Sequence, residues 1–213
     1  MEVKIIKICK SENKKERYII HISNGESYEI FSEVLLKFAL RSGDCIGIEV
    51  LESILTENDR IKAKRTALRL LAKRIRTKKE IINKLEQKGF TESIIDYTIQ
   101  ELIRIELVND EEFIEKYVNN SISLKKPYGK HALKYKLQKL GIQKPMIEQK
   151  LPMLIGDNDE YEIAMNLARK KIVLLSKYDE HKKKQKLYSF LAGRGFSWDI
   201  VSKVLTELNF KEE

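Results

Sequence analysis

The chain of 213 residues has few of the side chains that build metal or redox sites: two cysteines and three histidines. Cys9 and Cys45 lie in apolar, strand-like segments, so we expect both to be small buried hydrophobic residues rather than a redox pair. His21, His131 and His181 lie far apart, with no second ligand at a suitable spacing. The sequence therefore predicts no metal site and no cofactor.

Long apolar segments and catalytic motifs are also missing. No segment approaches the roughly 20 apolar residues needed to cross a bilayer, and the first residues lack the layout of a signal peptide. We expect a cytoplasmic protein without a membrane partner. There is no Gly-rich phosphate loop and no local nucleophile–base pair. These absences favour a binding protein; an enzyme whose site is assembled only in three dimensions is the alternative.

Charged residues, in contrast, are abundant and unbalanced. Lys and Arg number 41 against 32 Asp and Glu, which gives a formal net charge of +9. Such an excess favours an acidic partner, most commonly a nucleic acid. A general compositional bias toward lysine is the other explanation.

A short motif recurs three times in the last two thirds of the chain. In each copy, a leucine stands four residues before a glycine, and an apolar residue follows the glycine. The glycines are 52 and 54 residues apart, and further apolar positions match before and after each one. We infer an internal repeat of about fifty residues. The three copies are residues 84–90, 136–142 and 190–196.

The motif predicts the end of one helix and the start of the next. Gly89, Gly141 and Gly195 would adopt the left-handed conformation just after a helix, and the apolar residue that follows would complete a Schellman motif. Thr91 and Ser197 would then be N-caps of the next helix.

The N-terminal segment, up to residue 57, has a different pattern. Asn24-Gly25 is a strong hairpin signal between two β-rich runs. Residues 32–40 predict a helix with Ser32 as its N-cap. Residues 46–54 are consistent with either strand or helix. We expect a small α+β module whose strands are residues 3–8, 17–22 and 27–31.

The segment 60–79 contains ten Lys or Arg and no Asp or Glu. Its apolar residues recur with helical spacing, and its basic residues form one stripe along the helix. Like charges in a row repel, so folding alone does not favour them. We predict contact with phosphate or an acidic partner; a solvated face, screened by salt, is the alternative. The stripe consists of Lys62, Arg65, Arg69, Lys73 and Arg76.

Two further basic segments precede predicted helices. The first is a Pro-Gly loop at residues 125–130, which suits an anion beside a helix N-terminus but is equally consistent with an ordinary connection. The second is residues 181–186. From these segments, and from the helical turn that follows the first, we select Lys126, Lys130, Lys134, Lys182, Lys183 and Lys184.

Local signals predict the remaining details. Thr77 and Glu80 form a capping box, and Asn109 is the N-cap of a later helix with acids in its first turn. Residues 156–160 are expected to be a loop. We expect Trp198 to pack in a core, with base stacking as its second possible role.

Three stretches together resemble the RecX family, regulators of the RecA recombinase. The first is residues 107–113, an apolar pair followed by acids and Phe113. The second is Tyr128-Gly129 with the spaced apolar residues that lead to Gly141. The third is residues 186–196. The resemblance covers about residues 60–210, and the N-terminal segment is similar to an extension of some Gram-positive members.

The resemblance implies a mainly α fold: three three-helix repeats, about nine helices, in an elongated curved array after a small α+β module with a β-hairpin. The expected divisions are 1–57 for the module and 58–107, 108–156 and 157–213 for the repeats.

The resemblance also implies a monomer that binds the RecA–single-stranded-DNA filament and mostly inhibits RecA in recombination, DNA repair and the SOS response. Single-stranded DNA, and secondarily duplex DNA, are the expected nucleic-acid partners. A general DNA-binding repeat protein that acts without RecA, and an RNA- or ribosome-associated protein, are the alternatives. The candidate contact residues are Arg65, Arg69, Lys73, Arg76, Lys126, Lys130, Lys134, Lys182, Lys183 and Lys184.

Overall fold

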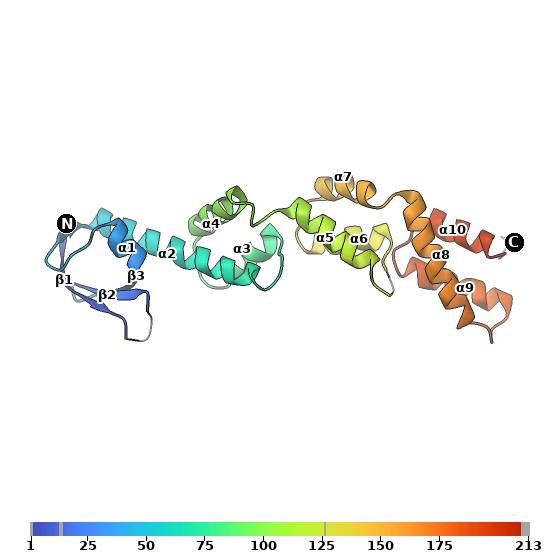
Figure 1. Ribbon diagram of the computed structural model, residues 1–213, viewed down its shortest axis with the longest axis horizontal. Coiled ribbons are helices and arrows are strands. Elements are labelled where there is room, and N and C mark those ends of the chain that lie inside the picture. The colour runs from blue at the N-terminus through green and yellow to red at the C-terminus, as the bar shows by residue number, and fades with distance from the viewer. Residues whose placement is uncertain (1, 13–14, 126, 210–213) are drawn as a thin grey trace. The chain divides into compact units, whose positions relative to one another are not determined.

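A computed structural model describes residues 2–12, 15–125 and 127–209. These residues form a mainly helical protein with a small antiparallel sheet at the N-terminus (Figure 1). Contacts divide the chain into two compact units. One comprises Met1–Arg74 with Ile81–Val108, and the other Ile75–Glu80 with Asn109–Glu213. Within the described residues, no helix has the length and apolar character needed to cross a membrane.

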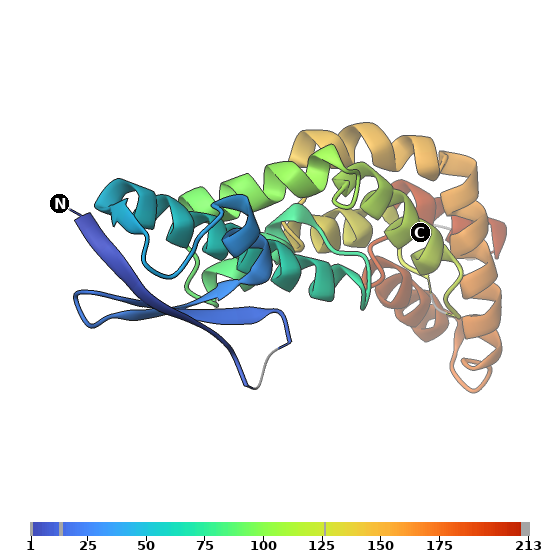
Figure 2. The same ribbon diagram turned by 60° about the vertical axis from the view of Figure 1, so that its left-hand side comes forward.

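The N-terminal sheet confirms the three predicted strands and adds a fourth. The strands are antiparallel in the order β3-β2-β1-β4, and α1 and the first half of α2 lie over one face (Figure 2). Gly25 has a φ of +90° in the predicted hairpin turn. The strands are β1 (Glu2–Lys10), β2 (Arg17–Ile22), β3 (Ser27–Phe31) and β4 (Cys45–Gly47).

The first helix, α1 (Ser32–Lys37), begins one residue earlier than its predicted cap implies. Phe31, and not Ser32, is the N-cap, since its backbone stays extended as the end of β3. Its N–H donates to the buried side chain of Asn58, at 3.0 Å. A long-range acceptor, which local sequence does not reveal, therefore sets the start of this helix.

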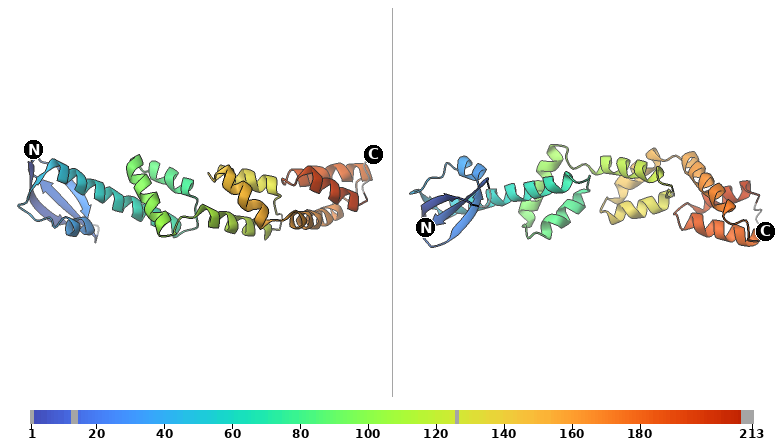
Figure 3. Two further views of the ribbon diagram at one scale, coloured as in Figure 1. Left: turned by 90° about the horizontal axis from the view of Figure 1, so that it is seen from above. Right: turned by 60° about the horizontal axis from the view of Figure 1, so that its bottom comes forward.

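Helix α2 (Ile48–Leu71) resolves the ambiguous segment and joins the module to the first repeat (Figure 3). Leu51 and Ile54 pack beneath the sheet, whereas Ala63 and Ala67 belong to the core of the next two helices. The helix runs without interruption across the expected division between residues 57 and 58. The four residue ranges expected for the module and the repeats remain a proposal.

The three-helix repeats are confirmed, and each one encloses its own apolar core. The C-terminal half of α2 packs with α3 (Lys78–Glu86) and α4 (Glu92–Arg104). The second repeat consists of α5 (Asp110–Ile122), α6 (Lys130–Lys139) and α7 (Lys144–Leu154). The third consists of α8 (Asp157–Val173), α9 (Glu180–Ala192) and α10 (Trp198–Glu207).

The recurring glycines end the middle helix of each repeat, as predicted. Gly89, Gly141 and Gly195 have φ values of +79°, +86° and +80°. In the first copy, Gly89 N–H donates to the carbonyl of Glu86 at 2.9 Å, and the next N–H donates to that of Leu85 at 3.3 Å. Equivalent pairs occur in the other two copies. This is the hydrogen-bond pattern of a Schellman motif.

Several caps are confirmed, and one expected loop is wrong. Thr77 and Glu80 exchange capping-box hydrogen bonds, and Asn109 accepts from two backbone N–H groups. Residues 156–160 are not a loop, because α8 already begins at Asp157. The Asp159 carboxylate accepts from the Gly156 N–H at 2.9 Å. The acids are therefore in the first turn of a helix, where its dipole stabilises them.

Two predictions of burial are also wrong. Cys45 is exposed on the short strand β4, and Cys9 is half-buried near the end of β1. The side chain of Trp198, at the first position of α10, is 64% exposed. The third core is filled instead by aliphatic residues and Phe196, so Trp198 lies outside it.

The second and third repeats meet through glycine backbone. Gly129, the N-cap of α6, donates its N–H to the carbonyl of Arg194 at 3.0 Å, and the His131 N–H donates to that of Gly195 at 3.1 Å. A methyl group on Gly129 would lie less than 3.0 Å from the backbone of Gly195, and one on Gly195 less than 3.0 Å from the backbone of Ala132. Glycine is therefore required at both positions for close approach, and at Gly195 also for its positive φ.

A related contact holds the segment that leads into α3. The Thr77 hydroxyl donates to the carbonyl of Leu140 at 2.7 Å, and a methyl group on Gly141 would overlap the side chain of Lys79. The Lys78 N–H donates to the Asp110 carboxylate at 2.8 Å. At both junctions, a glycine that ends one middle helix meets the first turn of the preceding middle helix.

Candidate nucleic-acid interface

Arg65, the first candidate of the α2 stripe, is held by the N-terminal module. Its guanidinium is paired with the carboxylates of Glu16 and Glu33, and it lies over the ring of Phe31 at 4.4 Å from the centroid. The two carboxylate hydrogen bonds raise the pKa of Arg65 further above its usual value. The sequence shows no acid within this stripe, but the structure places two carboxylates beside Arg65. Glu16 and Glu33 lie 49 and 32 residues from Arg65 in the sequence.

The prediction that the stripe follows one helix is wrong at its end, because α2 ends at Leu71 and Lys73 and Arg76 lie beyond it. The other stripe candidates differ in their surroundings. Arg69 donates from Nε to the carbonyl of Arg65 at 3.2 Å. Arg76 lies 3.9 Å from the carboxylate of Glu80, and its side chain is largely buried. Lys73 is exposed, and its ammonium forms no ion pair with any residue that the structure describes. Of the four stripe candidates for binding, Lys73 is therefore the best placed for an external anion.

Arg65 and Lys73 give a direct test of this assignment. We expect Arg65→Ala to lower the free energy of unfolding by about 1 kcal/mol, because it removes two partly exposed ion pairs and a cation–π interaction. Lys73→Ala, the matched control in the same stripe, should change it by less than about 0.5 kcal/mol. Urea denaturation followed by circular dichroism measures both. Equal stability of the two variants would contradict the structural role of Arg65.

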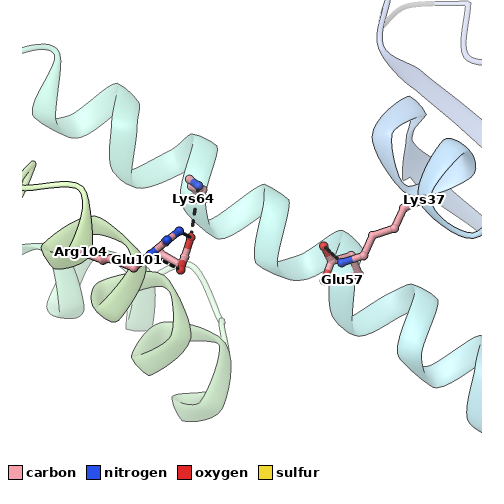
Figure 4. Close-up of polar contacts among 5 residues, drawn as sticks. All are labelled: Lys37, Glu57, Lys64, Glu101 and Arg104. Carbon is pink, nitrogen blue, oxygen red and sulfur yellow. Dashed lines mark hydrogen bonds and ion pairs between the residues drawn. The ribbon is translucent and has the colours of Figure 1, made fainter.

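Other basic residues on α2 and beside it also form ion pairs with acids of the same unit. Lys37 of α1 donates to Glu57 at 2.7 Å, and Lys64 lies 3.7 Å from Glu101 of α4 (Figure 4). Arg104 binds the same Glu101 carboxylate through two nitrogens, and these bonds lower the pKa of Glu101. Much of the positive charge of α2 and its surroundings is therefore compensated within this unit.

At the end of the basic Pro-Gly loop, Lys130 binds carboxylates of the protein itself. The Lys130 N–H, at the N-terminus of α6, donates to Glu160 Oε1 at 2.8 Å. The Lys130 ammonium pairs with Asp157 at 2.6 Å and lies 3.6 Å from Glu160, which is only 4% exposed. The anion expected at this helix N-terminus is thus the Glu160 carboxylate. Lys130 contributes to the junction of the second and third repeats.

The remaining candidates are mostly paired on the surface. Lys134 pairs with Glu148 at 2.5 Å, Lys182 with Asp179 at 3.3 Å and Lys183 with Glu180 at 2.5 Å. Lys184 lies on the same turn of α9. Lys126 lies outside the described residues. Within the described part of the chain, no contact joins the sequence-selected lysines into one surface.

A different set of side chains does come together, and sequence reasoning missed it. Tyr128 has the Lys136 ammonium 4.3 Å and the Arg194 guanidinium 5.2 Å from its ring centroid. Arg194 also lies 5.8 Å from the ring centroid of Phe190, and Lys171 lies 5.3 Å from the same centroid. Cations and rings thus alternate across the junction of the second and third repeats.

This row continues into a basic groove of about 670 Å³. The groove lies between the end of α8, the turn that follows it, and α9. Tyr178 lies in that turn, with Lys186 4.7 Å and Lys177 5.6 Å from its ring centroid. Among the described residues, no Asp or Glu lines the groove. Its lining residues are Lys171, Leu174, Leu175, Lys177, Tyr178, Gln185, Lys186, Ser189 and Phe190.

One signal in the sequence points to this groove. Tyr178 and Phe190 stand within a segment rich in lysine, so aromatic and basic residues are interleaved there. The density of lysine along the chain instead favours residues 182–184. Density does not reveal which lysines have acids one turn away and which face a ring.

Nothing in the described ranges, 2–12, 15–125 and 127–209, forms a group of three or more His, Cys, Asp or Glu able to hold a metal ion. Of the acids in the first turn of α5, Asp110 instead accepts the Lys78 N–H, and Glu112 pairs with Lys116. Burial raises the pKa of Asp110, although its hydrogen bond from the Lys78 N–H opposes this change.

Comparisons with known proteins identify the family. A protein of Clostridium acetobutylicum named regulatory protein RecX is 35% identical over 207 residues, which is 96% of this chain and 95% of the relative. The chain belongs to the RecX family. A RecX of Clostridioides difficile is 35% identical over 98% of this chain and 97% of its own length. Models of the first and third three-helix domains of RecX match residues 63–102 and 158–205.

Solved RecX structures agree with the fold. A crystal structure of regulatory protein RecX covers 96% of this chain and 99% of its own, with a TM-score of 0.75 at 24% identity. The RecX structure from Lactobacillus salivarius covers 73% of this chain and 99% of its own, with a TM-score of 0.67 at 30% identity. The RecX family is a family of regulatory proteins, and its three-helix repeats are those described above.

Proposed function

We propose that this protein binds the RecA–single-stranded-DNA filament in the cytoplasm and restrains RecA activity in recombination, DNA repair and the SOS response. It acts by binding and not by catalysis. The observation that carries the proposal is the 35% identity to regulatory protein RecX along 96% of the chain. A relationship over the whole length favours a shared partner, because it includes surfaces as well as cores.

The charge distribution supports a filament that contains nucleic acid. The net charge of +9 favours an anionic partner. Arg65 and Lys130 are engaged within the fold, so the binding role among the sequence-selected residues falls mainly to Lys73 and Arg69. The basic groove between α8 and α9 adds a second surface that can bind an anion.

The test is single-stranded-DNA-dependent ATP hydrolysis by RecA, with this protein titrated in at two salt concentrations. We expect inhibition well below one molecule per RecA, and its persistence at the higher salt. Simple competition for phosphates would instead require near-saturation of the DNA and would vanish with salt. Full RecA activity at saturating addition would contradict the proposal.

A control with extra single-stranded DNA separates the two mechanisms further. Free DNA relieves inhibition that arises from occupied phosphates, whereas it leaves inhibition at the filament largely in place. Complete relief would favour the second candidate function, a basic helical-repeat protein that binds DNA without RecA. The same net charge supports that candidate.

A further inference from the structure

We propose that the groove between α8 and α9 binds single-stranded nucleic acid, with Lys171, Lys177 and Lys186 on the phosphates and Tyr178 stacked on a base. We refer to these three lysines as the groove lysines. This inference rests on the proposed function, which it deepens by assigning the nucleic-acid contact to particular residues. It does not require RecA.

The charges in the groove favour an anionic ligand. Within the described part of the chain, the groove lysines form no ion pair and no carboxylate lines the groove. Lys182 and Lys183, on the same helix as Lys186, both have acidic partners within one turn. Three cations that gather in a concave surface without an acid repel one another, and an anion relieves that repulsion.

The groove also presents aromatic rings beside its lysines. Tyr178 and Phe190 both line the groove, and each is half-buried with a groove lysine within 5.3 Å of its ring centroid. Aromatic side chains beside a basic groove are the usual means of holding a single strand, because each base offers a face for stacking. A site for a small inorganic anion would not need these rings.

The junction of the second and third repeats holds this surface in position. Arg194 links the ring of Phe190 to that of Tyr128, where Lys136 continues the row. The carbonyl of Arg194 accepts the Gly129 N–H at 3.0 Å, so the repeat junction fixes this connection. A preformed row of cations and rings reduces the entropy lost when a flexible strand binds.

Single-stranded nucleic acid fits this surface better than a duplex. In a duplex the base faces are stacked on their neighbours, so Tyr178 has no base face available to it. Phosphate contacts from the groove lysines, in contrast, are open to either form. Tyr178 should therefore contribute to binding of a single strand and not of a duplex.

The test is fluorescence anisotropy of the full chain, without RecA, on a labelled oligo-dT and on a duplex of equal length. We expect Tyr178→Leu to weaken oligo-dT binding about tenfold, since it removes the stacking of one base, and Tyr178→Phe to stay within about twofold because its ring remains. Duplex affinity should change less than about twofold in both variants. Circular dichroism checks that each variant is folded.

The lysines have a matched control on the same helix. Lys171→Gln with Lys186→Gln should weaken binding and lower the slope of log affinity against log salt by about 1.4, or about 0.7 for each phosphate that a lysine no longer neutralises. Lys182→Gln with Lys183→Gln should leave the slope nearly unchanged. Equal decreases in affinity for the two double variants, unaltered binding by Tyr178→Leu, or no oligo-dT binding by the unmodified protein would each overturn the proposal.

The two proposals fail in different ways. If the protein inhibits RecA but Tyr178→Leu binds oligo-dT normally, the groove assignment is wrong and the RecA function stands. If Tyr178→Leu loses oligo-dT binding but the unmodified protein leaves RecA fully active, the groove assignment stands and the RecA function is wrong.

Discussion

Gly195→Ala should destabilise the protein by about 3 kcal/mol, from two separate costs. The first is the left-handed backbone, at a φ of +80°, which an alanine adopts at a cost of roughly 1–2 kcal/mol. The second is steric, because the new methyl group would lie less than 3.0 Å from the backbone of Ala132. The free energy of unfolding, from urea denaturation followed by circular dichroism, measures the sum.

Two other glycines separate these costs. Gly89 has a φ of +79°, but a methyl group there meets nothing within 4 Å, so Gly89→Ala should cost only about 1–2 kcal/mol. Gly129 has an ordinary φ of −75°, but a methyl group there would overlap the backbone of Gly195. Gly129→Ala therefore reports the steric cost alone. A Gly195→Ala variant no less stable than Gly89→Ala would contradict the close contact between the repeats.

Glu160→Leu should lower the free energy of unfolding by about 2–4 kcal/mol. The carboxylate is buried and accepts the Lys130 N–H at 2.8 Å. Without this carboxylate, the Lys130 N–H loses its acceptor at the start of α6. The Lys130 ammonium, whose side chain is only 18% exposed, then has only Asp157 as an ion-pair partner. Urea denaturation again gives the difference.

An exposed ion pair in the second repeat provides the control. Glu148 pairs with Lys134, and both side chains are at least a third exposed. Glu148→Leu should therefore lower the free energy of unfolding far less than Glu160→Leu, since water screens such pairs. If the two leucine variants were equally stable, Lys130 and Glu160 would be surface groups, and Lys130 would regain its place among the binding candidates.

The junction of the second and third repeats links these stability effects to the proposed nucleic-acid surface. The glycine contacts and the Lys130–Glu160 pair hold α6 against the third repeat. The same junction places Arg194 between two aromatic rings. Variants that loosen it should therefore be compared with groove variants only after their folding has been measured.

The sequence by itself determined the local structure. The three strands, the capping box at Thr77, the cap at Asn109 and the left-handed conformation of the three glycines all follow from residues within a few positions of one another. Such features depend on backbone sterics and on hydrogen bonds inside one turn, which the order of residues specifies directly. The spacing of the glycines likewise determined the number of repeats.

Only the tertiary structure decided which charges are compensated and which surface remains available. Arg65 meets Glu16 across 49 residues, and Lys130 meets Glu160 across 30. Tyr128 and Arg194 come from different repeats. The sign and density of charge are properties of the chain, but pairing depends on distance in space, and electrostatic attraction falls steeply with that distance and with exposure to water. Basic residues that look equivalent in the sequence therefore have different roles in the fold.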